Sequence, residues 1–239
     1  ITGTLNSVAG EVNSLTVRSG ETATAAGDFL VVGNVGNVDR LNNLTVDSND
    51  VDFDGSLRLA GNLDIDVANN GNMTFDNAAA IGGTVTLSGN GTGVITINPN
   101  ANFSTCGAFS QDVAGSVVLS ADITTTNDTV SFNNAVTLGD DVTIDTGAGA
   151  GDITFASTVS GARTLGVVAG TGAVTFTGAV ALDGLTTLAQ AYGIAFNGNA
   201  DINQAVTFQN TGALALGNGA DTLTFSGGLT STSAATTIN

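Results

Sequence analysis

The sequence predicts an all-β protein, in the form of a β-solenoid of about ten coils with phenylalanine stacked inside. Three observations lead to this prediction. Short segments alternate apolar and polar residues, a small motif ending in phenylalanine returns, and copies of that motif lie 20–23 residues apart. The chain has 239 residues, 42 % of them hydrophobic, which is enough for one elongated β domain with a real core. We therefore predict a single solenoid over residues 1–239.

Alternating segments of four to seven residues, bounded by Gly or Asn, follow one another along the chain. In Leu63–Val67 and Thr84–Ser88, for example, every second residue is apolar. This is the pattern of a strand with one buried side, and no window shows a helical period with caps. Residues 1–98 are expected to form less regular coils, and residues 116–239 regular coils. Between them, residues 99–115 hold the only proline, and we expect an irregular loop or insertion there.

The returning motif is an aliphatic residue, a small and usually polar residue, and a phenylalanine, followed by a turn rich in Gly or Asn. Eight of the eleven phenylalanines occupy it, namely Phe53, Phe75, Phe132, Phe155, Phe176, Phe196, Phe208 and Phe225. The separations are 22, 23, 21 and 20 residues for the pairs Phe53–Phe75, Phe132–Phe155, Phe155–Phe176 and Phe176–Phe196. A coil of that length returns the chain above itself at about 4.8 Å, so each ring is expected to stack on the next.

Two copies of the motif depart from this spacing, because Phe208 and Phe225 follow the preceding copy after 12 and 17 residues. They are expected on adjacent sides of one coil or in shortened coils. The alternative fold is a series of tandem antiparallel β-sandwich modules. That fold needs frequent hairpin turns of the Asn-Gly type. Turns such as Asn90-Gly91 and Asn197-Gly198 are too few to support it.

The charge of the chain restricts its partners and its chemistry. The formal net charge is −17, from 21 acidic residues against four arginines, with no lysine or histidine. Such a surface repels nucleic acid and anionic lipid, and the lack of any run of about 20 apolar residues argues against membrane insertion. Without histidine, Ser-His and Cys-His nucleophiles are excluded, and we expect no enzyme. The single cysteine, Cys106, is expected to be a small buried residue.

Part of the sequence resembles a known class of bacterial repeats. The stretch Gly151–Val159 (GDITFASTV), the tripeptide Arg163-Thr164-Leu165 and the stretch Gly170–Phe176 (GTGAVTF) are similar to repeats of filamentous-haemagglutinin-like exoproteins and autotransporter passengers. The resemblance covers residues 115–239 well and residues 1–114 loosely. It implies a right-handed parallel β-helix that is secreted or displayed on a bacterial cell surface. It brings no catalytic residue with it.

One acidic motif is a candidate calcium site. Residues 50–55 read Asp-Val-Asp-Phe-Asp-Gly, so Asp50, Asp52 and Asp54 are spaced like the first ligands of an EF-type loop. The twelfth position, where that loop carries Glu, is a glycine, and the flanks are strands. The alternative, which this context favours, is that the three carboxylates simply face solvent. Stacked coils are expected to bring Asp64 and Asp66 nearby. We expect no cofactor, and Ca²⁺ is the only candidate.

Other polar motifs are expected to be turns or modification sites. Gly217–Leu223 matches half of a calcium-binding nonapeptide but occurs once, so a Gly-rich turn is expected. An acid group of the kind found in polysaccharide-cleaving β-helices would consist of Asp140, Asp141, Asp145 and Asp152. It lacks His and Lys companions, so a solvated turn is expected here too. Glycosylation sequons begin at Asn43, Asn72, Asn90, Asn102 and Asn127. Of these, Asn102 is expected to be the most exposed, because it lies in the irregular segment.

Two functions are compatible with these features. The first is a non-enzymatic structural role, as the subunit of a self-assembling extracellular fibre or layer on a bacterial surface. Copies would join head to tail, because an uncapped solenoid leaves strand edges open at its ends. The alternative is an adhesin stalk or passenger segment that binds glycans or cell-surface components, with residues 99–115 as its recognition element.

Overall fold

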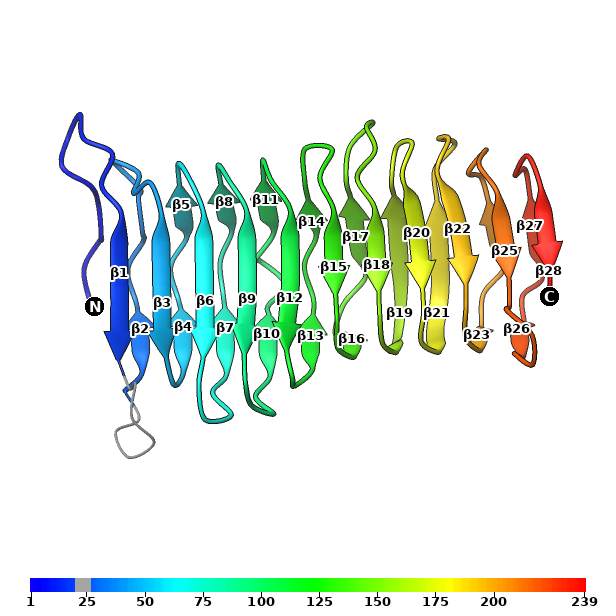
Figure 1. The fold of residues 1–239 in the computed structure, drawn as a ribbon, viewed down its shortest axis with the longest axis horizontal. Helices are drawn as coiled ribbons and strands as arrows, with labels where there is room; N and C mark the ends of the chain where they lie inside the picture. Colours follow the sequence, from blue (N-terminus) through cyan, green and yellow to red (C-terminus); the bar gives the residue numbers. More distant parts are fainter. Residues whose placement is uncertain (20–26) are drawn as a thin grey trace. The chain divides into compact units, whose positions relative to one another are not determined.

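The computed structural model describes residues 1–19 and 27–239, and these residues form 28 strands and no α-helix. The strands pair in parallel and wind into a β-solenoid of about ten turns (Figure 1). This confirms the predicted fold class, and the antiparallel alternative is wrong. The chain divides into two compact units, Ile1–Ala121 and Asp122–Asn239, and each is described by itself.

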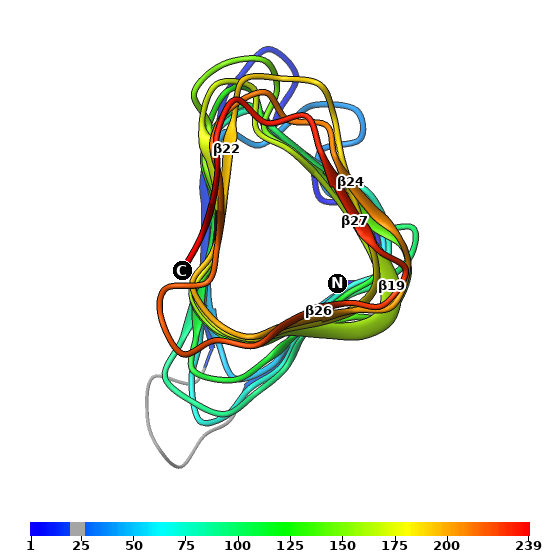
Figure 2. The same cartoon turned by 90° about the vertical axis from the view of Figure 1, so that its right-hand side faces the viewer.

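In the first unit, short strands line up in three rows. The first row contains β1 (Leu15–Ser19), β3 (Leu44–Ser48), β6 (Leu63–Val67), β9 (Val85–Gly89) and β12 (Phe109–Val113). The second row contains β2 (Phe29–Val31), β4 (Val51–Phe53), β7 (Met73–Phe75), β10 (Ile95–Ile97) and β13 (Val117–Leu119). The third row contains β5 (Leu57–Leu59), β8 (Ala79–Ile81) and β11 (Phe103–Thr105). Seen end on, a coil therefore has three sides (Figure 2).

The second unit also has three rows. The first contains β15 (Val130–Phe132), β18 (Ile153–Phe155), β20 (Ala173–Phe176), β22 (Gly193–Phe196), β25 (Leu214–Leu216) and β28 (Thr236–Ile238). The second contains β16 (Val136–Leu138), β23 (Ala200–Ile202) and β26 (Leu223–Phe225). The third contains β14 (Ile123–Thr124), β17 (Val142–Asp145), β24 (Val206–Phe208) and β27 (Leu229–Ser231). Two longer strands, β19 (Val159–Val168) and β21 (Val180–Thr187), continue from the second row into the third.

The strand register measures the length of a coil directly. In the first unit, paired residues are 19, 22 and 24 positions apart, in the pairs Leu44–Leu63, Leu63–Val85 and Val85–Phe109. In the second unit they are 23, 21, 20, 20 and 22 apart, in the pairs Val130–Ile153, Ile153–Val174, Val174–Ile194, Ile194–Leu214 and Leu214–Thr236. The coil length is thus 19–24 residues for these pairs, a slightly wider range than the spacing of the phenylalanines predicts. The pair Leu15–Leu44 of β1 and β3 is longer, at 29 positions.

The alternating sequence explains which residues form the core. Successive side chains of a strand point to opposite sides, so every second residue of a coil points inward. In β6, Leu63, Ile65 and Val67 are buried, whereas Asp64 and Asp66 between them are exposed. Inward apolar residues of successive coils therefore stack on one another, and the outward positions are mostly polar, with exceptions such as Leu30, Val32 and Leu188.

Seven of the eight motif phenylalanines are buried and Phe225 is half-buried, and six of them stack as predicted, in separate groups. Phe53 and Phe75 have ring centroids 5.5 Å apart and an interplanar angle of 13°. In the second unit, rings of Phe132, Phe155, Phe176 and Phe196 stack with centroids 5.4, 5.2 and 4.8 Å apart. The first pair lies in the second row of its unit and the second group in the first row of its unit, so the motif does not mark one side of the coil. Each parallel contact adds about 0.5–1.5 kcal/mol beyond burial.

The two irregularly spaced copies lie on different sides of the coil. Phe208 is in β24, on another side of the coil that contains Phe196, and Phe225 follows in β26 of the next coil. Their rings meet edge to face, with centroids 6.1 Å apart and an interplanar angle of 82°. The spacing of 12 residues therefore reflects adjacent sides of one coil, which was one of the two expectations, whereas the spacing of 17 residues leads to a different side of the next coil.

The predicted loop at residues 99–115 is wrong. This stretch supplies β11 and β12, and Phe103 and Phe109 are buried with ring centroids 5.4 Å apart. Pro99 is compatible with the coil because it lies in the turn before β11, where the N–H of Ala101 donates to the carbonyl of Asn98 at 2.8 Å. The expectation for Cys106 is also wrong, because this residue is exposed.

The position of Cys106 follows from the strand pattern. Thr105 occupies the inward position at the end of β11, and its hydroxyl donates to the carbonyls of Gly83 and Gly107. The next residue must therefore point outward. Thr105, whose hydroxyl bonds the backbone at the corner after β11, therefore occupies the buried position, and Cys106 lies outside.

Candidate functional site

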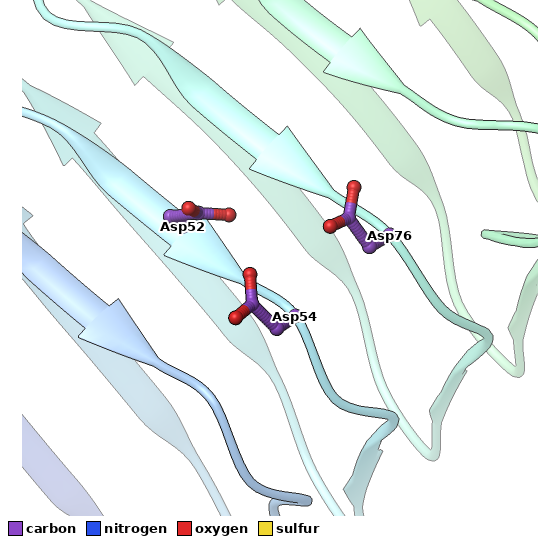
Figure 3. A group of neighbouring side chains, drawn as sticks. All are labelled: Asp52, Asp54 and Asp76. Atoms are coloured by element: carbon purple, nitrogen blue, oxygen red, sulfur yellow. The ribbon is translucent and has the colours of Figure 1, made fainter. Parts of the chain in front are cut away.

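Three aspartates from two consecutive coils form the acidic cluster, defined here as Asp52, Asp54 and Asp76 (Figure 3). Asp52 is the outward residue of β4, because Val51 and Phe53 on either side of it are buried. Asp54 follows β4, and Asp76 follows β7 at the equivalent position of the next coil, since Phe53 pairs with Phe75. One carboxylate oxygen from each aspartate lies within 4.8 Å of the others.

Hydrogen bonds offset only part of the negative charge of the acidic cluster. The carboxylate of Asp76 accepts a hydrogen bond from the side-chain amide of Asn98 at 2.5 Å. One carboxylate oxygen of Asp52 is buried and has no hydrogen-bond partner among the described residues. Burial raises the pKa of Asp52, and the charges of Asp54 and Asp76 raise it further. These oxygens are the ligand type that Ca²⁺ takes, and a cation here would offset the mutual repulsion.

The acidic cluster corrects the predicted ligand set. Asp52 and Asp54 belong to it, but Asp50 does not. One carboxylate oxygen of Asp50 instead accepts the backbone N–H of Asn72 at 2.6 Å. Asp76 was missed, because it lies one coil further along the chain. The 22-residue separation of Phe53 and Phe75, applied to Asp54, would have found it.

The expectation that Asp64 and Asp66 lie beside these residues is wrong. Both belong to β6, in another row of the first unit, and neither is part of the acidic cluster. Asp66 is instead paired in register with Asp47 of β3. Burial raises the pKa of Asp66, and the charges of Asp47 and Asp64 raise it further. The first row thus has its own unfavourable contact between like charges.

Many other Asn and Asp residues have a shared structural role, and we call them corner acceptors. Each directly precedes a strand, and its side-chain oxygen accepts the backbone N–H of the equivalent residue in the next coil, at 2.6–3.0 Å. The donor–acceptor pairs are Asn62–Asn43, Thr84–Asn62, Asn72–Asp50 and Val94–Asn72 in the first unit, and Thr143–Asp122, Thr164–Asp141, Ala173–Asp152 and Thr222–Asn199 in the second. These bonds join coil to coil at the corners.

The corner acceptors account for much of the predicted acid group. Asp141 and Asp152 are corner acceptors, and the carboxylates of Asp140 and Asp145 accept the N–H groups of Asp141 and Gly147. Among the described ranges, no metal-binding group of three includes any of these four. Their contacts are those of solvated turns, as expected.

The corner acceptors also bear on the sequons. Asn43 and Asn72 are corner acceptors, and the side-chain oxygen of Asn127 accepts the N–H of Gly149 at 2.5 Å. Asn102 is exposed but directly precedes β11, so the loop expected around it is wrong. Asn90 is exposed in the turn after β9. Whether any of the five sequons carries a glycan stays a prediction.

The Gly217–Leu223 stretch connects β25 to β26 as a turn. The backbone N–H of Asn218 donates to a carboxylate oxygen of Asp221 at 3.0 Å, which closes it. Asp221 belongs to no metal-binding group of three in the part of the chain that the structure describes. This agrees with the expected Gly-rich turn.

The last coil of the second unit presents three open strand edges. Its strands β26, β27 and β28 each pair on one side only, with β23, β24 and β25. Leu229 is 39 % exposed and Ile238 is 76 % exposed, whereas Val206 and Leu216, their register partners one coil earlier, are buried. This surface, made of β26, β27 and β28, is called the open edge below.

In the first unit, β1 pairs only with β3 among the named strands. Residues 1–5 lie along the other side of β2, where the amino group of Ile1 donates to the carbonyl of Leu30 and the N–H of Val32 donates to the carbonyl of Ile1. The inward residues Leu15 and Val17 of β1 are half-buried, so β1 lacks the cover that strands deeper in the unit have.

None of the residues that the structure describes belongs to a helix long and apolar enough to cross a membrane. No protein-family model, no curated protein and no solved structure matches the chain.

Proposed function

We propose that this chain is a non-enzymatic scaffold, the subunit of a self-assembling extracellular fibre or layer on a bacterial surface. The observation that carries this proposal is the open edge, on which three parallel strands and their apolar residues lack a covering coil. Unpaired strand edges attract further strands. The surface that pairs with three parallel edges at once is another coil of the same kind, and the first coil of a second copy supplies one.

The distribution of charge supports contacts between ends rather than between sides. The chain carries −17 overall, so two copies placed side by side repel each other. Residues 202–239 contain one charged side chain, Asp221, and residues 1–19 contain only Glu11 and Arg18. Repulsion is therefore weakest where the open edge of one copy would meet the first coil of another.

The joint between copies would be weaker than the joint between coils of one chain. The residues that precede β26, β27 and β28 are Thr222, Gly228 and Ala235, and none has the carboxylate or amide oxygen of a corner acceptor. Strand pairing and apolar contact would hold the copies together. The proposed assembly is therefore reversible and depends on concentration.

The adhesin alternative depended on residues 99–115 as a recognition loop. That stretch forms β11 and β12 of the coil, so the alternative has lost the element that was to bind the glycan.

Negative-stain electron microscopy and light scattering over a range of concentrations test the proposal. Wild-type protein is expected to form linear end-to-end particles, and the substitutions Leu229→Glu and Ile238→Glu together to keep it monomeric. The matched control is Thr186→Glu, which adds a charge at an exposed position of β21 within the second unit. Wild-type protein that stays monomeric at every concentration would contradict the proposal.

A further inference from the structure

The chain contains four Asn-Gly pairs, at Asn70-Gly71, Asn90-Gly91, Asn197-Gly198 and Asn218-Gly219. In such a pair the backbone nitrogen of glycine can attack the side-chain carbonyl carbon of asparagine, because glycine has no side chain to hinder the approach. The attack needs a free asparagine side chain, a free glycine N–H and room for the backbone to move. The four pairs differ in all three respects.

Asn70-Gly71 is held at both reacting groups. The side-chain oxygen of Asn70 accepts hydrogen bonds from the backbone N–H and the hydroxyl of Thr92, at 2.9 and 3.2 Å. The N–H of Gly71 donates to the carbonyl of Ala68 at 2.9 Å. Gly71 is buried, and a Cβ added there would overlap the carbonyl oxygen of Asn49. Attack at this pair requires several contacts to break first.

The pairs Asn90-Gly91 and Asn197-Gly198 are intermediate in how firmly their reacting groups are held. Neither side chain of Asn90 and Asn197 makes a hydrogen bond within residues 1–19 and 27–239. The glycines that follow them are packed against the preceding coil, however. A Cβ at Gly91 would overlap the backbone of Asn70, and one at Gly198 would lie 2.9 Å from the backbone of Gly178.

At Asn218-Gly219 both reacting groups are free, and the backbone has room to move. Asn218 and Gly219 are exposed, and a Cβ built on Gly219 meets nothing within 4 Å. Gly219 has a φ of 146°, a conformation suited to glycine. Among the described residues, neither the side-chain amide of Asn218 nor the N–H of Gly219 has a hydrogen-bond partner. The bond that closes the turn uses the backbone N–H of Asn218, so it leaves the side chain free.

We infer that Asn218-Gly219 is a self-modifying site of this chain, with water as the co-reactant. The N–H of Gly219 loses its proton to solvent base, and its nitrogen forms a bond to Cγ of Asn218. The bond from Cγ to Nδ2 breaks, and the nitrogen takes up a proton and leaves as ammonia. Water then opens the five-membered imide at either carbonyl, which yields aspartate or isoaspartate at position 218.

The modification affects the connection between β25 and β26. A carboxylate at position 218 lies close to that of Asp221, which accepts the backbone N–H of residue 218 in the native turn. Isoaspartate also adds one carbon to the main chain between these strands. Both changes oppose the native turn, and β26 pairs only with β23 beyond it. The site is therefore placed to loosen the last coil as the protein ages.

Peptide mapping by mass spectrometry tests this inference. Folded protein and protein unfolded in urea are incubated at the same mildly alkaline pH, and conversion is followed at all four pairs. The ratio of folded to unfolded rate measures the protection of each pair, so each serves as its own control for local sequence. Asn218 is expected to react at close to its unfolded rate. Asn70 is expected to be slowed more than about tenfold, because at least two hydrogen bonds must open.

The variant Asn218→Gln is expected to abolish the fast conversion in the folded protein, while Asn70→Gln leaves it unchanged. Hydrogen exchange of β26 is expected to rise in the converted wild type and to stay constant in incubated Asn218→Gln protein. The inference is overturned if folded Asn218 is protected as strongly as Asn70, or if Asn70 reacts as fast as Asn218.

Discussion

At the scale of single residues, the surface of this protein combines coil-joining oxygens with like charges that repel. Corner acceptors such as Asn72 take an N–H from the next coil, so they are satisfied. Asp52 has neighbouring charges instead, and one of its oxygens is buried without a donor among the described residues. Side chains of similar composition therefore have opposite effects on stability, according to whether they precede a strand or lie within one.

Replacing Asp52 with Asn is expected to stabilise the protein at neutral pH. The folded state raises the pKa of Asp52 above the ordinary value of 3.8, so the folded chain holds this proton more tightly than the unfolded chain. Stability contributed by this group is thus present at low pH and lost as pH rises through the raised pKa. We expect a gain of up to about 1 kcal/mol for Asp52→Asn, since the carboxylate is partly exposed.

Urea unfolding at a series of pH values checks this prediction. The difference between wild type and Asp52→Asn should be largest at neutral pH and should shrink as the solution is acidified. Asp201→Asn, which removes a charge from the exposed side of β23, serves as the control. A variant that is less stable than wild type at neutral pH would show that the ionised carboxylate is favourable.

Calcium is expected to raise the melting temperature of the wild type at neutral pH. A cation held by the acidic cluster would remove the repulsion, and a ligand that binds only the folded state stabilises it by mass action. The same titration with Asp76→Asn should show a smaller shift, and with Asp50→Asn an unchanged one, because Asp50 lies outside the acidic cluster. Equal shifts in all three proteins would assign the effect to general screening of charge.

Loss of a corner acceptor is expected to destabilise the fold modestly. Asn72→Ala removes the acceptor of the Val94 N–H, so the free energy of unfolding should fall by about 0.5–1.5 kcal/mol. Asn100→Ala, at an exposed turn position, is the matched control and should change stability little. Denaturant unfolding measures both, and equal effects would mean that the corner bond contributes nothing of its own.

At the scale of elements, the core is a set of short stacks rather than one continuous column. Within the second unit, Phe155 lies between Phe132 and Phe176, with centroids 5.4 and 5.2 Å away. Edge-to-face contacts, such as Phe196 with Phe208, link rings on different sides of a coil. Most strands have only two or three inward residues, so every ring supplies a large part of the buried surface of its coil.

Truncation inside a stack is expected to be severe. Phe155→Ala should lower the free energy of unfolding by about 3–5 kcal/mol, because it leaves a cavity between two rings. Thr154→Ala, the adjacent outward position of β18, should change it by less than about 0.5 kcal/mol. Guanidinium unfolding, followed by circular dichroism, measures the free energy of unfolding of both variants. A small effect of Phe155→Ala would mean that the coils close readily over the gap.

The strands and the coil length were predictable from local pattern, and the side on which a ring lies was not. Alternation identifies strands such as β6 because inward and outward residues differ in polarity. It failed at β11 and β12, where Thr105 and Gln111 are buried polar residues. Two of the three members of the acidic cluster were predicted, because only those two are close in the sequence. Asp52 and Asp54 are neighbours in sequence, whereas Asp76 meets them only through the register between β4 and β7.

At the scale of the whole molecule, the proposed scaffold depends on end-to-end contact between copies. The charge of −17 opposes side-by-side contact, and the open edge gives each copy a surface that another coil can complete. Such contact is heterologous, so it extends into a filament when it does not close into a ring. The residues that precede β26, β27 and β28 are not corner acceptors, so the contact is sensitive to concentration.

Hydrogen exchange measured as a function of protein concentration tests end-to-end assembly most directly. Directly after β28, the N–H of Asn239 donates to the carbonyl of Leu216 in β25, so the N–H of Ile238 points to the open edge. The same alternation directs the N–H of Leu229 outward from β27, because Gly228 on one side of it bonds to β24. These amides should exchange fast in dilute protein and slowly in concentrated protein, while amides of β18 stay unchanged. Fast exchange of Ile238 and Leu229 at every concentration would contradict end-to-end assembly.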